Sequence, residues 1–182
     1  MKKWYSLIDK SYRIENLELA FKRVKRNHGA PGIDGETVED YAENLDINTE
    51  LLHEKLKTNT YEPSPVRRVE IEKPDGGIRL LGVPTVKDRV VQQAIVNIIG
   101  ELFDATFHPS SYGYRPKHSQ HQAVAKAESF MNKYVLTEVV DMDLSKCFDT
   151  LDHEIIMDAV AELISDGKVL KLIKKFRNYS VA

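Results

Sequence analysis

The chain has 182 residues, of which 42% are hydrophobic and 30% charged, a balance typical of a soluble globular protein. Its one cysteine, Cys147, excludes a disulfide framework, and no apolar run approaches the roughly 20 residues that a membrane span needs. Because the N-terminus also lacks an apolar stretch of signal-peptide length, the composition predicts a cytoplasmic protein without membrane contact.

The formal net charge of −2 does not favour a nucleic-acid binder, but the charges are unevenly distributed. Four of the five residues 22–26 are Lys or Arg, whereas residues 32–54 contain eight acids and no Lys or Arg. Residues 138–166 contain nine acids and a single lysine. Basic patches for phosphates and an acidic pocket for a metal would produce this distribution. Solvated helix faces would produce any one of these runs as well, and remain the alternative.

The first third of the chain predicts three helices around a glycine-rich loop. Apolar residues at spacings of three and four indicate an amphipathic helix over 15–27. Residues 29–35, GAPGIDG, hold three glycines in seven, which lets the backbone pass close to a ligand. Thr37 and Asp40 predict the capped start of a second helix, and a third is expected over 48–57.

A β-hairpin is predicted next, with strands over 66–71 and 78–83 around an Asp-Gly-Gly turn. Lys73 and Arg79 flank this turn, where Arg offers a phosphate a bidentate fork and Lys a point charge. A solvated hairpin that carries charge to avoid edge pairing is the alternative. Thr85 with Asp88 predicts the start of a long helix, and apolar residues at helical spacing continue it to Phe103.

Residues 108–117 form a predicted loop rich in Ser, Pro, Gly and Tyr. Within it, Arg115 is a candidate phosphate ligand, and Tyr112 or Tyr114 is available for base stacking. Tyrosines in such a pair also commonly serve packing alone. Further helices are predicted over 121–132, 152–164 and 169–176, and helices interleaved with few strands indicate an α+β fold.

An apolar, β-branched run over 134–143 predicts a buried strand that ends on Asp141 and Asp143. The side-chain period of two places both carboxylates on one face, and oxygen ligands of this kind suit Mg²⁺. Leu144 can add its backbone carbonyl, and Phe148 can lean over a nucleotide sugar. Solvent-exposed or helix-capping aspartates are the alternative.

Taken in order, four segments resemble the fingers and the first half of the palm of a group II intron reverse transcriptase. They are GAPGIDG at 29–35, residues 61–95, SYGYRPKHSQHQAV at 111–124 and VVDMDLSKCFDTLDH at 139–153. The resemblance implies a fingers–palm fragment that is mostly helical, with a fingers β-hairpin and a partial palm sheet. It also implies three parts: an N-terminal extension with a template-lid loop at 1–60, fingers at 61–130, and the start of the palm at 131–182.

The same resemblance assigns roles to individual residues. Asp143 would be the first catalytic, metal-binding aspartate, helped by the carbonyl of Leu144, and Lys73, Arg79 and Phe148 would bind the nucleotide. The basic residues and the resemblance together give the residues expected to bind RNA or template: Lys22, Arg23, Lys25, Arg26, Gly29, Ala30, Pro31, Gly32, Arg67 and Arg115. The complete enzyme would use Mg²⁺, intron and template RNA, a DNA primer and deoxynucleoside triphosphates in intron splicing and mobility.

One part of the family's pattern is missing from the 182 residues. A second carboxylate pair, on a Tyr-Ala-Asp-Asp hairpin, is not in the sequence, and one carboxylate does not build a two-metal site. The sequence is therefore expected to be a fragment without polymerase activity of its own. An RNA-binding, maturase-like module and a homodimerisation module are the alternatives. Related retron, diversity-generating and CRISPR-associated reverse transcriptases also remain open.

Overall fold

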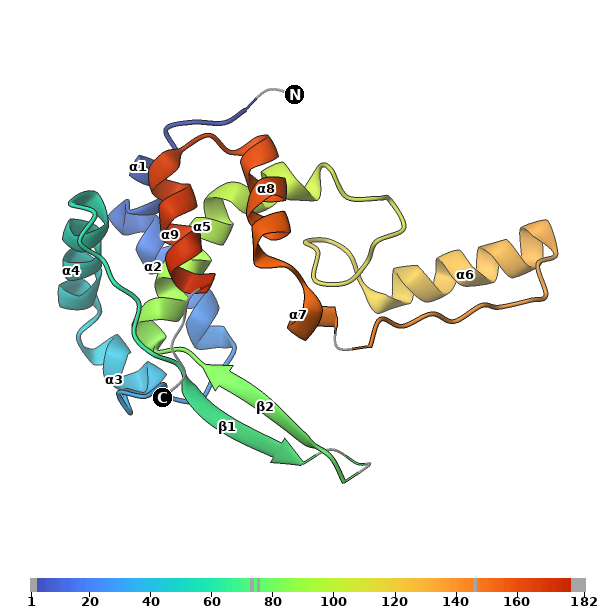
Figure 1. Ribbon diagram of the computed structural model, residues 1–182, viewed down its shortest axis with the longest axis horizontal. Coiled ribbons are helices and arrows are strands. Elements are labelled where there is room, and N and C mark those ends of the chain that lie inside the picture. The colour runs from blue at the N-terminus through green and yellow to red at the C-terminus, as the bar shows by residue number, and fades with distance from the viewer. Residues whose placement is uncertain (1–2, 73, 75, 146, 178–182) are drawn as a thin grey trace.

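The computed structural model describes residues 3–72, 74, 76–145 and 147–177, and helices dominate it (Figure 1). The helices are α1 Ile8–Ser11, α2 Ile14–Arg26, α3 Val38–Glu43, α4 Leu45–Lys57, α5 Val86–Asp104, α6 Gln120–Tyr134, α7 Cys147–Thr150, α8 His153–Leu163 and α9 Gly167–Arg177. Strands β1 Arg67–Glu72 and β2 Ile78–Val83 pair antiparallel, from Arg67 opposite Val83 to Glu72 opposite Ile78. The α+β prediction, mostly helical with one β-hairpin, is confirmed.

The centre of the fold is the packing of α2 against α5. Both helices turn an apolar stripe toward each other, and its buried members are Leu17, Ala20, Phe21 and Val24 of α2 and Val86, Val90, Val91, Ala94 and Ile95 of α5. Polar side chains add a second link, since Asn16 donates from Nδ2 to the carbonyl of Ala94 at 3.0 Å. Figure 1 shows α5 running through the middle of the helical body.

The C-terminal helices complete the same core. Ile164 and Val169 are fully buried in the cluster that also contains Leu7 and Leu17. The backbone of Trp4 joins this end of the chain directly, because its N–H donates to the carbonyl of Leu163 at 2.8 Å. One core therefore contains residues from all three predicted parts, and the division at 60 and 130 stays a prediction.

The buried carboxylate of Asp166 joins the start of α1 to the start of α9. Its Oδ2 accepts the N–H groups of Leu7 at 2.7 Å and Ile8 at 3.0 Å, at the start of α1. Its Oδ1 accepts those of Lys168 at 3.0 Å and Val169 at 3.2 Å, in the first turn of α9. Burial by itself raises the pKa of Asp166, but these four bonds outweigh it and the pKa lies below its ordinary value.

Side-chain caps mark several of the predicted helix starts. Thr37 and Asp40 form the capping box expected at the start of α3, and the Thr85 hydroxyl accepts the N–H of Asp88 at 3.2 Å. Asp152 caps α8 by accepting the N–H of Glu154 at 2.7 Å. The third helix, α4, begins at Leu45, three residues before its predicted start.

Helix α6 and the segment after it extend away from the body (Figure 1). No residue of α6 is buried, and Val139 and Val140 beyond it are 80% and 79% exposed. The prediction of a buried strand over 134–143 is wrong, and the described residues contain no palm sheet. The physical reason is that a strand needs a hydrogen-bonded neighbour, and no described segment pairs with this one.

Replacing Asp166 with Asn is expected to destabilise the fold by about 2 kcal/mol, because charged acceptors bind backbone N–H groups more strongly than neutral ones. Since the folded-state pKa of Asp166 is depressed, its contribution is present above the unfolded value of about 4 and is lost as the pH falls through the folded value. Urea unfolding across this pH range measures the effect. A variant as stable as the wild type, with the same pH dependence, would contradict it.

Candidate functional site

The first turn of α5 is where the chain that enters the hairpin is anchored. Asp88 is fully buried, and its Oδ1 accepts a hydrogen bond from the Tyr61 hydroxyl. Its Oδ2 accepts the backbone N–H of Ser64 at 3.1 Å. Because a buried carboxylate is costly without such donors, both bonds hold the segment before β1 against α5. The base of the hairpin is thereby placed next to this turn.

The loop 29–35 is anchored on the same turn. Arg89 donates from Nη2 to the carbonyl of Ala30 at 2.8 Å. Gly32 lies so close that a Cβ there would stand 2.6 Å from the Cα of Thr85. Gly35 has a φ of +74°, a conformation that glycine adopts without strain. Gly32 thus allows the loop to lie close to the start of α5, and Gly35 allows the left-handed turn that follows.

Burial lowers the pKa of the Arg89 guanidinium, and the charge of Asp34 acts in the opposite direction. Arginine stays protonated at neutral pH even so. The loop therefore carries a positive charge directly beneath it.

The basic end of α2 leads into this loop. With 3.6 residues per turn, Lys22 and Arg26 lie opposite the apolar stripe of the helix, and Arg23 and Lys25 lie on its two flanks. All four are exposed. Arg23 donates to Oδ1 of Asn97 on α5 at 2.5 Å, whereas the described residues make no hydrogen bond or ion pair with the other three side chains. Three flexible cations are therefore available at the entrance of the loop.

The hairpin presents Arg67 and Arg79 on one face. The register pairs Arg67 with Val83 and Ile71 with Arg79, so these side chains alternate with those of the opposite face. On this face Leu81 lies between the two arginines and Ile71 lies opposite Arg79, and these two side chains are 41% and 45% exposed. Lys73 lies outside the described residues. The face thus combines two cations with an uncovered apolar strip.

The guanidinium of Arg115 is hydrogen-bonded to residues of the loop between α5 and α6 and of the end of α5. Its Nε donates to Oδ1 of Asp104 at 2.7 Å, and its Nη1 donates to the carbonyls of His108 and Ser111, both at 2.9 Å. The hydrogen bond from Arg115 lowers the pKa of Asp104. The side chain of Arg115 is only 8% exposed, so it fixes the loop between α5 and α6. Tyr114 is fully exposed, and a phosphate contact by Arg115 stays a prediction.

Asp141 and Asp143 lie in the extended segment before α7, and both are exposed. The carbonyl of Leu144 accepts the N–H of Cys147 at 3.2 Å, which leaves one of its lone pairs free. These oxygen donors suit a hard divalent cation. Among the described residues, however, no three His, Cys, Asp or Glu side chains are grouped to hold a metal. The side chain of Phe148 lies outside the described part of the chain.

Sequence reasoning missed the anchoring roles of Asp88 and Arg89. It used Asp88 only as a marker of a helix start, and nothing local to residues 85–89 announces contacts with Tyr61 or Ala30. The one available signal was the pattern of glycines at 29–35, which requires some close neighbour.

No described helix is both long and apolar enough to cross a membrane.

The sequence matches the family model described as reverse transcriptase (RNA-dependent DNA polymerase) over residues 71–180, more than half of the chain. The chain therefore belongs to the reverse transcriptase family. Members of this family generally use a divalent metal.

Three relatives are similar to the chain, and two of them are intron proteins by name, which confirms the resemblance. The chain is 32% identical to the group II intron-encoded protein LtrA of Lactococcus lactis subsp. cremoris, covering 87% of this chain and 26% of that protein. It is 35% identical to protein YkfC of Escherichia coli (strain K12), covering 80% and 39%. It is 27% identical to nuclear intron maturase 1, mitochondrial, of Arabidopsis thaliana, covering 68% and 18%. The chain spans less than half the length of each of them.

Gly32→Ala is expected to destabilise the fold by about 1–3 kcal/mol, because the added Cβ would meet backbone atoms that cannot rotate away. Gly113→Ala is the matched control, since a Cβ at Gly113 meets nothing within 4 Å. Thermal unfolding of both variants measures the difference. Equal stabilities would show that the loop does not depend on this close approach.

Proposed function

We propose that this chain is the template- and nucleotide-binding part of an RNA-directed DNA polymerase of the group II intron type, acting in intron splicing and mobility. The observation that carries the proposal is the meeting of two segments at the first turn of α5. Asp88 anchors the base of the hairpin there, and Arg89 and Gly32 anchor the loop 29–35 that follows the basic end of α2. The hairpin and the loop are thereby brought together at this turn, beside the basic end of α2.

In this proposal RNA follows that edge. Lys22, Lys25 and Arg26 contact phosphates, and the backbone of residues 29–32 lies over the template strand, with Arg23 and Arg67 beside them. Support comes from the exposure of the α2 cations and from the lack of internal partners for three of them among the described residues. Such contacts position a strand without reading its sequence. Arg115 would join them only by giving up internal acceptors.

In this proposal the hairpin binds the nucleotide and residues 141–144 bind the metal. Arg79, with Lys73, holds the triphosphate of the incoming nucleotide, and Phe148 lies over its sugar. Asp143 and the Leu144 carbonyl are two oxygen ligands for Mg²⁺, which would stabilise the attacking and leaving oxygens once the site has its further carboxylates. The complete enzyme would also bind a DNA primer, and the cytoplasm remains the proposed compartment.

An RNA-binding module without chemistry is the second candidate. It is favoured by the exposure of Asp143 and by the absence of a metal-ligand group among the described residues. A homodimer is the third candidate. Val140 and Met142 are 79% and 86% exposed, and exposed apolar surface of this kind often forms a protein–protein interface. Sedimentation that depends on protein concentration would support the dimer.

The triple variant Lys22→Glu, Lys25→Glu, Arg26→Glu is expected to bind a labelled single-stranded RNA at least about tenfold more weakly at low salt. Each neutralised phosphate contributes about 0.7 to the slope of log affinity against log salt, so the slope should fall by about 2 units. Fluorescence anisotropy over a KCl titration measures both. The control reverses Lys57, Lys126 and Lys133, which are exposed on other helices. An unchanged affinity of the α2 variant would remove this helix from the RNA path.

The purified 182-residue chain is expected to show no primer extension on an RNA template, with or without Mg²⁺. The reason is that a two-metal site needs more carboxylates than Asp141 and Asp143. Incorporation of labelled deoxynucleotides measures the activity, and a full-length reverse transcriptase serves as the positive control. Extension that disappears in Asp143→Asn would contradict this expectation and show a site assembled from the chain itself.

A further inference from the structure

Helix α9 carries a second concentration of positive charge. Its eleven residues, Gly167–Arg177, include four lysines and no acid. At 3.6 residues per turn, Lys168, Lys171, Lys174 and Lys175 fall within about a third of the helix circumference. The opposite side is apolar. From sequence alone, such a basic amphipathic helix is typical of membrane surfaces or of a helix that enters a partner's groove.

The fold excludes both of those uses, because the apolar side of α9 is already covered. Val169 is fully buried and Leu172 is 6% exposed, both within the main core. Phe176 packs against the Tyr61 ring with a centroid distance of 6.0 Å. Insertion into lipid or into a groove would require this face to leave the core. Only the charged side is therefore available to a partner.

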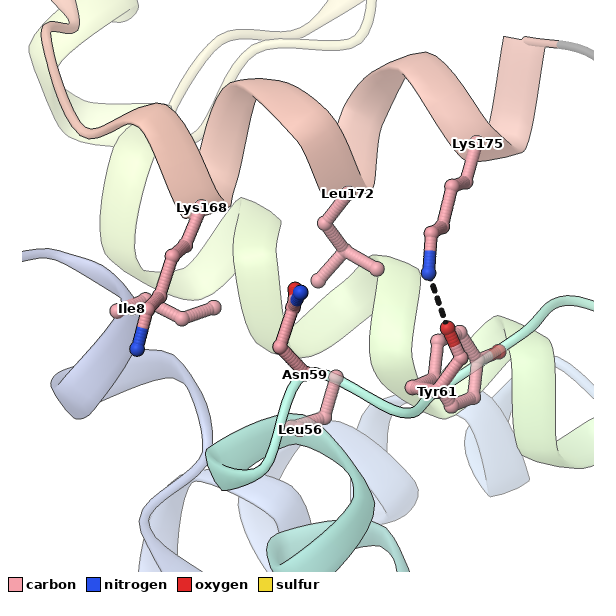
Figure 2. A pocket seen from close by; sticks show the side chains of 7 residues that line it. All are labelled: Ile8, Leu56, Asn59, Tyr61, Lys168, Leu172 and Lys175. Carbon is pink, nitrogen blue, oxygen red and sulfur yellow. Dashed lines mark hydrogen bonds between the residues drawn. The ribbon is translucent and has the colours of Figure 1, made fainter.

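One of the four lysines has a structural role. Lys175 donates to the carbonyl of Tyr61 at 2.7 Å and to Oε1 of Glu62 at 2.6 Å, and its side chain is only 18% exposed. Figure 2 shows Lys175 and Lys168 reaching from α9 across a small hollow, toward Tyr61 and Ile8 respectively. Lys175 therefore fastens α9 to the chain that enters the hairpin.

The other three lysines are exposed, and the described residues form no hydrogen bond or ion pair with their ammonium groups. Of the acids on neighbouring elements, Glu62 pairs with Lys175, and Asp158 and Glu162 on α8 are exposed. Lys168, Lys171 and Lys174 are called the α9 lysine face below. No described carboxylate forms an ion pair with this face, although the whole chain has a net charge of −2.

We infer that the α9 lysine face binds the phosphate backbone of RNA, as a contact separate from the basic end of α2. This inference rests on the proposed RNA-binding function and adds a second surface to it. Lysines are flexible point charges about one helical turn apart, and no aromatic or amide side chain on this face can read a base edge. The contact is therefore independent of RNA sequence and sensitive to salt.

The test compares the 182-residue chain with its variant Lys168→Gln, Lys171→Gln, Lys174→Gln. Gln removes the charge and has a helix propensity similar to that of Lys, so the fold should be retained, which circular dichroism and thermal unfolding check. Anisotropy with a labelled single-stranded RNA is expected to show about tenfold weaker binding at low salt. The slope of log affinity against log salt concentration should be smaller by about 2 units, because each of the three lost phosphate contacts contributes about 0.7.

The matched control is Lys57→Gln, Lys126→Gln, Lys133→Gln, which removes the same charge from exposed positions on α4 and α6. It is expected to bind RNA as the wild type does. An equal loss in both variants would mean that net charge alone governs binding, and would overturn the inference. Loss of polyglutamate binding in the α9 variant without loss of RNA binding would assign the face to an acidic protein and overturn it as well.

A footprint on the unmodified chain provides a readout that mutation does not disturb. Bound RNA should protect Lys168, Lys171 and Lys174 from acetylation, whereas Lys57 should react as in the free protein. Protection confined to Lys22 and Lys25 would refute the α9 contact while leaving the proposed function intact. A wild-type chain that binds no RNA would instead refute the proposed function, and this second inference with it.

Discussion

A buried carboxylate must be hydrogen-bonded, and this requirement at Asp88 determines how the parts of this protein meet. Asp88 is fully buried and takes its hydrogen bonds from the Tyr61 hydroxyl and the Ser64 N–H. The carbonyl of Tyr61 in turn accepts a hydrogen bond from Lys175. A single residue before the hairpin therefore links α5 to α9. The position of the hairpin, and of the cations on it, follows from this chain of contacts.

Asp166 follows the same principle where α1 meets α9, because its carboxylate accepts backbone N–H groups at the start of both helices. The segment from α6 to α7 has no equivalent anchor among the described residues. Its apolar side chains, such as Val124 at 66% and Val140 at 79%, remain exposed, and Asp143 stays in solvent. The structure thus combines a well-packed body with an open arm. The residues implied in RNA contact belong mainly to the body, and the residue implied in metal binding belongs to the arm.

Much of the fold was predictable because its causes are local. Apolar spacing predicted α2, α5 and α6, and the Asp-Gly-Gly turn predicted the hairpin. Thr37 with Asp40 predicted a capping box, which is present. The absence of a strand over 135–143 was not predictable in the same way. Its β-branched residues favour a strand locally, but a strand forms only where a neighbouring segment pairs with it. Four ordered motifs indicated the family, and the family comparison confirmed it.

The sequence by itself thus determined the hairpin, the family, the residue types at the candidate site, and the described helices other than α1 and α7. Only the tertiary structure decided which of these side chains are available. Arg115 is hydrogen-bonded to Asp104 and to two carbonyls, and Lys175 is hydrogen-bonded to the carbonyl of Tyr61. Lys22 and Lys171, in contrast, are exposed. The physical reason is that helix propensity and turn chemistry act over a few residues. A charged group, in contrast, finds its partner through space, as Asp166 does with Leu7.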